Sequence, residues 1–215
     1  SGTGPFNYAW TGTGVFNPDA ASPNATVSGA ATGMYLVVVS NACGSTSAAI
    51  SVVVQSAPSA TIAYAGSPYC ASAGTANVTR TGSAGGTYGA SPSGLSLNTN
   101  NGNINLAAST AGSYTVTYTV AASSGCSAFS TTAQVAVTEA PSASIAYSGT
   151  PYCSSAGTAI VTRAGTSGGT YGASPSGLAL NTSNGNINLS ASTVGSYTVT
   201  YTVAAAGGCS AFSTT

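Results

Sequence analysis

The sequence has no lysine and no histidine, and only two arginines, one aspartate and one glutamate carry charge among 215 residues. General acid–base catalysis needs titratable side chains held beside a reacting proton, and Asp19 and Glu139 are 120 residues apart. Zinc sites need clustered cysteines or histidines, and calcium sites need several converging oxygens. We therefore expect no enzymatic activity, no metal ion and no cofactor.

The scarcity of positive charge and of long apolar runs excludes two further classes. Two arginines cannot form a stripe that neutralises nucleic-acid phosphates. No apolar run approaches the roughly 18 residues of a membrane-spanning helix, and the start at Ser1 shows no signal peptide. We expect no nucleic-acid partner and no membrane span, and we interpret the chain as a processed or excised segment.

The residues that are present favour an ordered β protein, because 43% are hydrophobic and the apolar ones alternate with polar ones. In Gly112–Val120, tyrosine and valine occupy one face and threonine the other, which predicts a half-buried antiparallel strand. The same nine residues recur at Gly195–Val203. A Gly-x-Tyr that enters such a strand is also typical of a tyrosine corner, in which the phenol bonds to nearby backbone.

An internal repeat of 83 residues sets the domain organisation. Residues 57–139 are a full repeat, and residues 140–215 copy it without a gap, with 14 differences among 76 comparable positions. Residues 1–56 form a different unit. We predict an all-β fold of tandem Ig-like antiparallel β-sandwiches of Greek-key type. We expect the first unit to be truncated at its N-terminus and the last repeat before its final strand.

Several segments of the chain have a familiar pattern. In the 57–139 repeat they are Tyr69–Ala76, Gly85–Tyr88, Gly102–Leu106 and Gly112–Tyr118, and in the first unit they are Gly4–Trp10 and Gly33–Val37. With these segments the repeat resembles the Ig-like repeats of large secreted cell-surface proteins of Bacteroidetes-type bacteria, including gliding-adhesin-like and type IX-secreted proteins. The first unit is similar to PKD-like repeats of the same proteins. The resemblance implies an architecture of tandem sandwiches that act as spacers.

Four of the five cysteines recur at one spacing. Cys70 and Cys126 in one repeat match Cys153 and Cys209 in the next. We predict the disulfides Cys70–Cys126 and Cys153–Cys209, with buried free thiols as the alternative, and Cys43 unpaired. Disulfides imply an oxidising, extracellular setting.

Two other residue groups could make contacts. Arg80 and Arg163 could dock onto Glu139 or a neighbouring chain, or each could lie along an aromatic ring or the rim of a sheet. The tyrosines could form a sugar-stacking platform, or they could belong to the core. They are Tyr64, Tyr69, Tyr88 and their copies Tyr147, Tyr152 and Tyr171.

The sequence thus favours a structural role. We expect a rod-like spacer segment of an extracellular, cell-surface filament or repetitive adhesin. Its partners would be copies of itself or neighbouring repeats, because a β protein without lysine or net charge leaves its edge strands unguarded. The alternative is a carbohydrate-binding or adhesive module that recognises surface glycans through exposed tyrosines.

Overall fold

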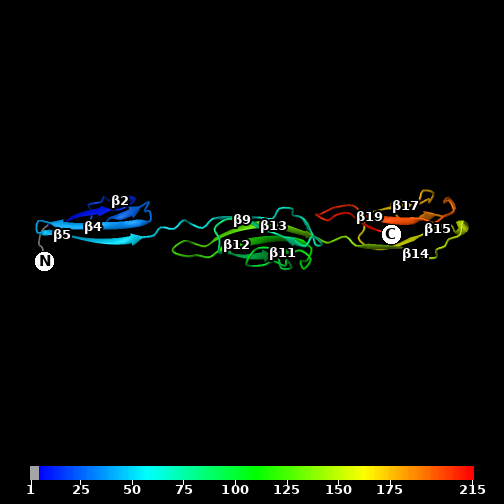
Figure 1. The fold of residues 1–215 in the computed structure, drawn as a ribbon, viewed down its shortest axis with the longest axis horizontal. Helices are drawn as coiled ribbons and strands as arrows, with labels where there is room; N and C mark the ends of the chain where they lie inside the picture. Colours follow the sequence, from blue (N-terminus) through cyan, green and yellow to red (C-terminus); the bar gives the residue numbers. More distant parts are fainter. Residues whose placement is uncertain (1–4) are drawn as a thin grey trace. The chain divides into compact units, whose positions relative to one another are not determined.

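The computed structural model describes residues 5–215, so Ser1–Gly4, which include the first residue of the predicted Gly4–Trp10 strand, lie outside the described residues. Two compact units divide the chain: Ser1–Pro58 with Ala122–Ala128, and Ser59–Ala121 with Phe129–Thr215. Within residues 5–215 the only helical element is the three-residue 3-10 turn η1 (Ser154–Ala156). The predicted all-β, Ig-like sandwich class is confirmed (Figure 1).

The first unit contains two antiparallel sheets. One has the order β1-β4-β5 and the other pairs β2 with β3. Among the described hydrophobic residues of this unit, Tyr35 is the one that is fully buried, whereas Met34 and Ile50 are mostly exposed. The strands are β1 (Asn7–Thr11), β2 (Val15–Asn17), β3 (Thr26–Ser28), β4 (Gly33–Asn41) and β5 (Gly44–Val52).

The 57–139 repeat is a sandwich around one apolar core. One layer is the four-stranded sheet β10-β12-β13-β7, and the pairs β6-β9 and β8-β11 lie on the other side of the core. The chain passes repeatedly between the layers, as a Greek-key sandwich requires. The strands are β6 (Ala60–Ala63), β7 (Tyr69–Cys70), β8 (Thr75–Ala76), β9 (Thr79–Gly82), β10 (Thr87–Ser91), β11 (Ile104–Asn105), β12 (Gly112–Val120) and β13 (Phe129–Thr138).

In the 140–215 repeat the strands pair in the same order as in the first copy, but no strand corresponds to β7. Thr87 pairs with Thr119 in the first copy, and Thr170 pairs with Thr202 in the second, a shift of 83 positions in each strand. The strands are β14 (Ala143–Tyr147), β15 (Thr158–Ala159), β16 (Val161–Gly165), β17 (Thr170–Ser174), β18 (Ile187–Asn188), β19 (Thr198–Val203) and β20 (Phe212–Thr214). The antiparallel pairs that the two repeats share thus follow the predicted 83-residue shift, and the parallel β7–β13 pairing occurs in the first copy.

Strand β12 carries the core, as its alternation predicts. Tyr114, Val116 and Tyr118 are buried, and the threonines between them are half-buried or exposed. The hydroxyl of Tyr114 donates a hydrogen bond to the carbonyl oxygen of Thr110 over 2.7 Å, and Tyr197 repeats this bond to Thr193. The predicted tyrosine corner is therefore confirmed in both copies.

Candidate junction between neighbouring repeats

Backbone pairing fixes Cys70 at one end of its sandwich. Strand β7 pairs in parallel with the end of β13, where Thr138 lies opposite Cys70. The amide of Ala71 donates a 2.8 Å hydrogen bond to the carbonyl of Thr138 and closes this ladder. Glu139 follows at once, so Cys70 lies where the chain leaves for the next repeat. Its side chain is only 3% exposed.

A tight turn presents Cys209. Ala206 and Cys209 exchange backbone hydrogen bonds of 2.9 and 3.1 Å across a two-residue turn. Gly207 and Gly208 make this turn with φ of 58° and 79°. Two consecutive positive φ values fit the mirror-image turns that suit the twist of a hairpin, and glycine adopts them at little cost. The Gly-Gly sequence thus forms the tip of the hairpin between β19 and β20.

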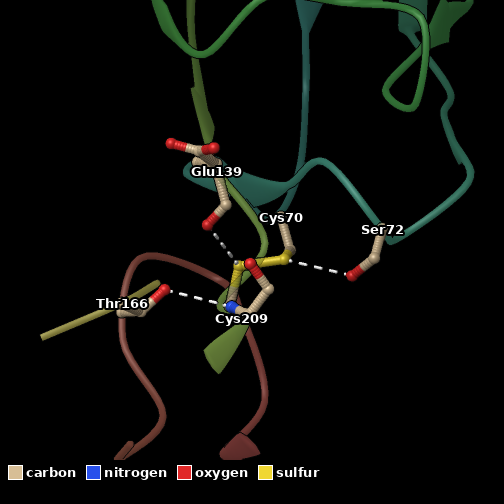
Figure 2. The surroundings of a disulfide bond; sticks show 6 residues. Cys70, Ser72, Glu139, Thr166 and Cys209 are labelled. Atoms are coloured by element: carbon tan, nitrogen blue, oxygen red, sulfur yellow. Dashed lines mark hydrogen bonds between the residues drawn. A yellow bond between two sulfur atoms is a disulfide. The ribbon is translucent and has the colours of Figure 1, made fainter. Parts of the chain in front are cut away.

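Cys70 and Cys209 form a disulfide that joins the two repeats (Figure 2). Their Cα atoms are 4.6 Å apart, and 139 positions separate them in the sequence. The Ser72 hydroxyl lies 3.2 Å from Cys70 Sγ, and the Glu139 carbonyl oxygen lies 3.5 Å from Cys209 Sγ. In the chain-entropy view, closing a loop of this length stabilises the folded chain by about 5 kcal/mol.

The predicted disulfides Cys70–Cys126 and Cys153–Cys209 are wrong. Cys126 and Cys153 are free, and Cys209 is paired with Cys70 instead. The reason is the length of β13: Cys126 precedes its first residue, whereas Cys70 lies beside its last residue, Thr138. Ten residues of extended strand span roughly 30 Å, and disulfide-bonded Cα atoms lie within about 7 Å of each other. The prediction that Cys43 is unpaired in this segment agrees with its free thiol.

The hairpin tip fits this junction because it lacks side chains. A Cβ atom on Gly208 would collide with the carbonyl oxygen of Pro68, and one on Gly207 would strike the side chain of Thr138. In the preceding repeat, Ser124 stands at the position of Gly207. Two of the few differences between the copies, at positions 206 and 207, thus fall in this tip. These two differences are the signal in the sequence that could have identified the junction.

The three free cysteines have different surroundings. Cys43 and Cys153 are exposed, whereas Cys126 is partly exposed, with Sγ 3.9 Å from the carbonyl oxygens of Gln55 and Ser56. The Ser155 hydroxyl lies 3.1 Å from Cys153 Sγ. Hydrogen bonds from the Ser155 side chain and backbone lower the pKa of the Cys153 thiol.

Each arginine lies against its own repeat. The Arg80 guanidinium stands over the ring of Tyr118, 5.6 Å from the centroid, and donates to the carbonyls of Gly82 and Ser83 over 3.0 and 2.8 Å. Arg163 has the corresponding place over Tyr201. The second interpretation from the sequence, an arginine along an aromatic ring, therefore describes these residues. Glu139 lies at the junction through its backbone carbonyl.

The tyrosines proposed as a sugar platform serve mainly as core residues. Tyr64 and Tyr88 are buried in the first copy and Tyr171 in the second. Burial raises the pKa of Tyr147 to about 12 and also raises the pKa of Tyr64. A stacking platform needs exposed rings, so these buried side chains do not supply one.

A groove of about 710 Å³ opens along β19 in the 140–215 repeat. In the first copy β12 pairs with β13 as far as Gly112 opposite Val137, and Val135 and Val137 are buried. In the second copy the β19–β20 pairing extends only from Val203 to Tyr201. The edge of β19 beyond Tyr201 therefore faces the groove. Apolar side chains line it, namely Ile145, Leu178, Ile187, Leu189, Tyr197 and Val199.

No group of three or more histidine, cysteine or carboxylate side chains that could hold a metal ion occurs within residues 5–215. In the same part of the chain, no helix has the length and apolar character needed to cross a membrane.

Comparisons with known proteins show likeness to tandem β domains. No family model and no curated protein matches the sequence. Protocadherin gamma B2 extracellular cadherin domains 1–5 are similar at 10% identity and a TM-score of 0.44, covering 97% of this chain. This chain spans about half, 51%, of that protein. The titin I-band fragment I67–I69 is similar at 11% identity and a TM-score of 0.43, covering 99% of this chain and 87% of the fragment. Drosophila N-cadherin EC1-4 is similar at 14% identity and a TM-score of 0.37, and the match covers 92% of this chain and 62% of that protein.

Proposed function

We propose that this chain is a structural segment of an extracellular bacterial surface filament or repetitive adhesin, of the Bacteroidetes-type secreted kind that it resembles. In this role it acts as a self-associating spacer with no catalytic activity. The proposal assigns it to the cell surface. The disulfide Cys70–Cys209 carries the argument.

This disulfide changes the path of a force applied to the chain ends. Tension that reaches Cys70 crosses directly to Cys209, so the 139-position segment between them bears no pull. The segment includes β12, β13 and most strands of the second copy. Disulfides within each repeat would instead leave the linker at Glu139 in the path of the force. Bonding one repeat to the next removes the junction and most strands of both repeats from the path of the force, which suits a spacer under tension.

The disulfide also supports the extracellular setting. Disulfides persist in oxidising compartments and are rare where thiol reductants act. Cys70 and Cys209 are 3% and 7% exposed, which shields the bond from soluble thiols. A buried, structural disulfide of this kind fits a secreted protein.

Surface chemistry supports self-association. The edge strands β10 and β17 both read Thr-Tyr-Gly-Ala-Ser and have no charged residue. Soluble sheet proteins usually guard such edges with lysine or other charges. With zero net charge, no long-range repulsion keeps copies apart.

Single-molecule stretching of the full chain tests the spacer role. In the oxidised chain, the 139 positions between the cysteines stay hidden, and reduction should lengthen the full extension by about 500 Å. Cys209→Ser should behave like the reduced chain, and Cys126→Ser should behave like the oxidised one. Equal extension before and after reduction would remove the argument.

Sedimentation tests self-association separately. The chain should form larger species as its concentration rises into the high micromolar range. A clean monomer throughout that range would remove the assembly claim and leave only a spacer.

A further inference from the structure

A pocket of about 480 Å³ in the 57–139 repeat is lined by β9, β10, β12 and the loop before β11. Its volume falls in the range of small-molecule sites, about 300–1,000 Å³. Arg80 comes from β9, Tyr88 from β10 and Tyr118 from β12, and the loop adds Asn100 and Asn101. All five belong to the first copy, in which the strands of both layers are present.

Arg80 gives this pocket a positive charge that no carboxylate of the described residues neutralises. Its Nη1 donates to the carbonyls of Gly82 and Ser83 over 3.0 and 2.8 Å, and the guanidinium carbon lies 5.6 Å from the ring centroid of Tyr118. These contacts fix the side chain and occupy one of its nitrogens. Nε and Nη2 have no protein partner within residues 5–215. Together they present the two parallel N–H groups that bind a carboxylate in bidentate fashion.

Tyr88 adds a hydroxyl without a partner in the protein. The residue is only 6% exposed, and its ring centroid lies 4.7 Å from that of Tyr118. The Tyr118 hydroxyl bonds to backbone, whereas the Tyr88 hydroxyl forms no hydrogen bond within residues 5–215. No fully buried side-chain oxygen in that part of the chain lacks a partner, so the Tyr88 hydroxyl is accessible. A phenol that is buried except at its hydroxyl can hydrogen-bond a ligand there.

The loop before β11 adds uncharged hydrogen-bonding groups. Asn98 Oδ1 accepts hydrogen bonds from the amides of Asn100 and Asn101 over 3.0 and 3.2 Å, which fixes the loop. Asn101 Oδ1 accepts from the amide of Asn103 over 3.0 Å, so its Nδ2 is left as a donor. The side chain of Asn100 is exposed and has no partner among the described residues. The pocket therefore combines one cation with several neutral donors and acceptors.

The 140–215 repeat presents the same groups. Arg163 lies 5.6 Å from the ring centroid of Tyr201. Tyr171 is 6% exposed, and its hydroxyl also has no partner within residues 5–215. The loop keeps Asn184 and has Ser183 in place of the other asparagine, so a hydrogen-bonding side chain remains there. Each chain thus carries this set of groups twice.

We propose that each set binds an acidic sugar, namely a hexuronate unit of an anionic polysaccharide. The carboxylate pairs with Nε and Nη2 of the arginine, and the sugar hydroxyls bond to the tyrosine hydroxyl and the loop side chains. An acidic peptide also offers carboxylates, but it has no ring of hydroxyls to satisfy the neutral groups. Recognition by an ion pair and hydrogen bonds needs no exposed aromatic ring, which agrees with the burial of Tyr88 and Tyr171.

Calorimetric titration of the full chain with trigalacturonate tests the proposal. We expect two sites per chain and an affinity that falls as salt is added, because salt screens an ion pair near the surface. The fully methyl-esterified trisaccharide is the matched control, since it keeps the rings and their hydroxyls but has no charge. It should bind at least about tenfold more weakly.

Paired tyrosine substitutions locate the site without disturbing the fold. Tyr88→Phe together with Tyr171→Phe removes hydroxyls that bond nothing in the folded chain. The free energy of unfolding should therefore stay unchanged, while the affinity for trigalacturonate should fall about three- to tenfold. Tyr114→Phe together with Tyr197→Phe is the control outside the pocket and should leave the affinity unchanged.

The arginine variants count the sites. Arg80→Gln should leave one site per chain, and the addition of Arg163→Gln should remove the other. Four results would overturn the proposal: no binding of trigalacturonate, equal binding of its ester, unchanged affinity in the variant with both Tyr88→Phe and Tyr171→Phe, and equal affinity for a triaspartate peptide. The last result would assign the pocket to acidic peptides.

This site goes beyond the proposed spacer role and does not depend on it. A chain that binds no acidic sugar can still carry tension and associate with its copies. The stretching and sedimentation results are obtained without any sugar, so failure of the titration is distinguishable from failure of the spacer role.

Discussion

Gly208 lies directly against the carbonyl oxygen of Pro68, at a separation that leaves no room for a Cβ atom. This contact sets the Cys209 hairpin against the strand that carries Cys70. The close approach that glycine allows in this turn therefore permits the disulfide between the two repeats. The first prediction follows from it.

Gly208→Ala should reduce formation of the Cys70–Cys209 disulfide. The new methyl group collides with backbone that cannot move aside, so the hairpin must retreat from Cys70. The fraction of chains that resist alkylation at both cysteines in a glutathione buffer measures the effect. We expect that fraction to fall several-fold.

Gly125→Ala is the matched control for this change. Gly125 occupies the same place in the preceding hairpin and has φ of 81°, against 79° at Gly208. Both substitutions therefore carry similar backbone strain of about 1 kcal/mol. A Cβ at Gly125 meets open space. Equal loss of the disulfide in both variants would show that turn strain, and not the Pro68 contact, controls the junction.

Tyr201→Phe should destabilise the 140–215 repeat. The Tyr201 hydroxyl accepts a hydrogen bond from the amide of Gly169 over 2.8 Å and donates one to the carbonyl of Thr166 over 3.0 Å. The residue is only 1% exposed, so removal of its hydroxyl leaves the Gly169 amide and the Thr166 carbonyl without this partner. The expected cost is about 1–3 kcal/mol in the free energy of unfolding, measured by urea denaturation.

Tyr197→Phe provides the comparison within the same repeat. Its hydroxyl donates a single bond to Thr193 in an exposed setting. Water can replace that bond, so we expect a loss of less than about 1 kcal/mol. If the two variants lose the same stability, the buried pair of bonds at Tyr201 is not the cause.

Apart from any effect of the Cys153 thiol, whose pKa is lowered, stability should be almost constant between pH 5 and 9 and should fall above pH 10. The pKa of Tyr147 is raised to about 12, so the folded chain keeps this phenol neutral while the unfolded chain ionises it near pH 10. The stabilisation is present below pH 10 and is lost as the pH rises towards 12. Because Tyr147 is only partly buried and solvent screens its charge, urea midpoints across this range should show a loss on the order of only 1 kcal/mol from this residue. Tyr147→Phe should make the alkaline loss smaller without removing it, because burial also raises the pKa of Tyr64. An unchanged alkaline loss would contradict the assignment.

A peptide with the sequence of residues 133–140 should bind the groove along β19. In the first copy the same sequence pairs with β12 and buries Val135 and Val137. Binding by strand addition combines backbone hydrogen bonds with burial of alternate side chains. It should raise the melting temperature of the chain as the peptide concentration increases.

The matched control is the same peptide with lysine at both valine positions. It keeps the backbone donors and acceptors but cannot bury its side chains in the apolar groove. The control should leave the melting temperature unchanged. Equal stabilisation by both peptides would mean that the groove does not select the alternating pattern.

Local pattern by itself predicted an all-β chain and its long central strand. Alternation of tyrosine, valine and threonine in Gly112–Val120 fixes which side chains face the core, because successive residues of a strand point to opposite faces. Gly112 and Tyr114 likewise predicted a hydrogen bond from the phenol to nearby backbone, which the carbonyl of Thr110 accepts. The near-identity of the copies predicted their common register. These features depend only on residues that are close in the sequence or on the repetition of a sequence. The boundaries 1–56, 57–139 and 140–215 as separate folding domains stay a prediction.

Only the tertiary structure decided which cysteines meet. Equal spacing suggested a bond inside each repeat, but spacing along the chain does not measure distance in space. Strand β13 holds Cys70 and the Cys126 hairpin at its opposite ends, and the glycine turn of the next repeat brings Cys209 to Cys70 instead. The groove along β19 likewise depends on which strands pair, because burial of Tyr114 but not of Tyr197 requires a covering strand. Disulfide pairing and burial are properties of distance in the folded chain, and only the packed sandwiches set those distances.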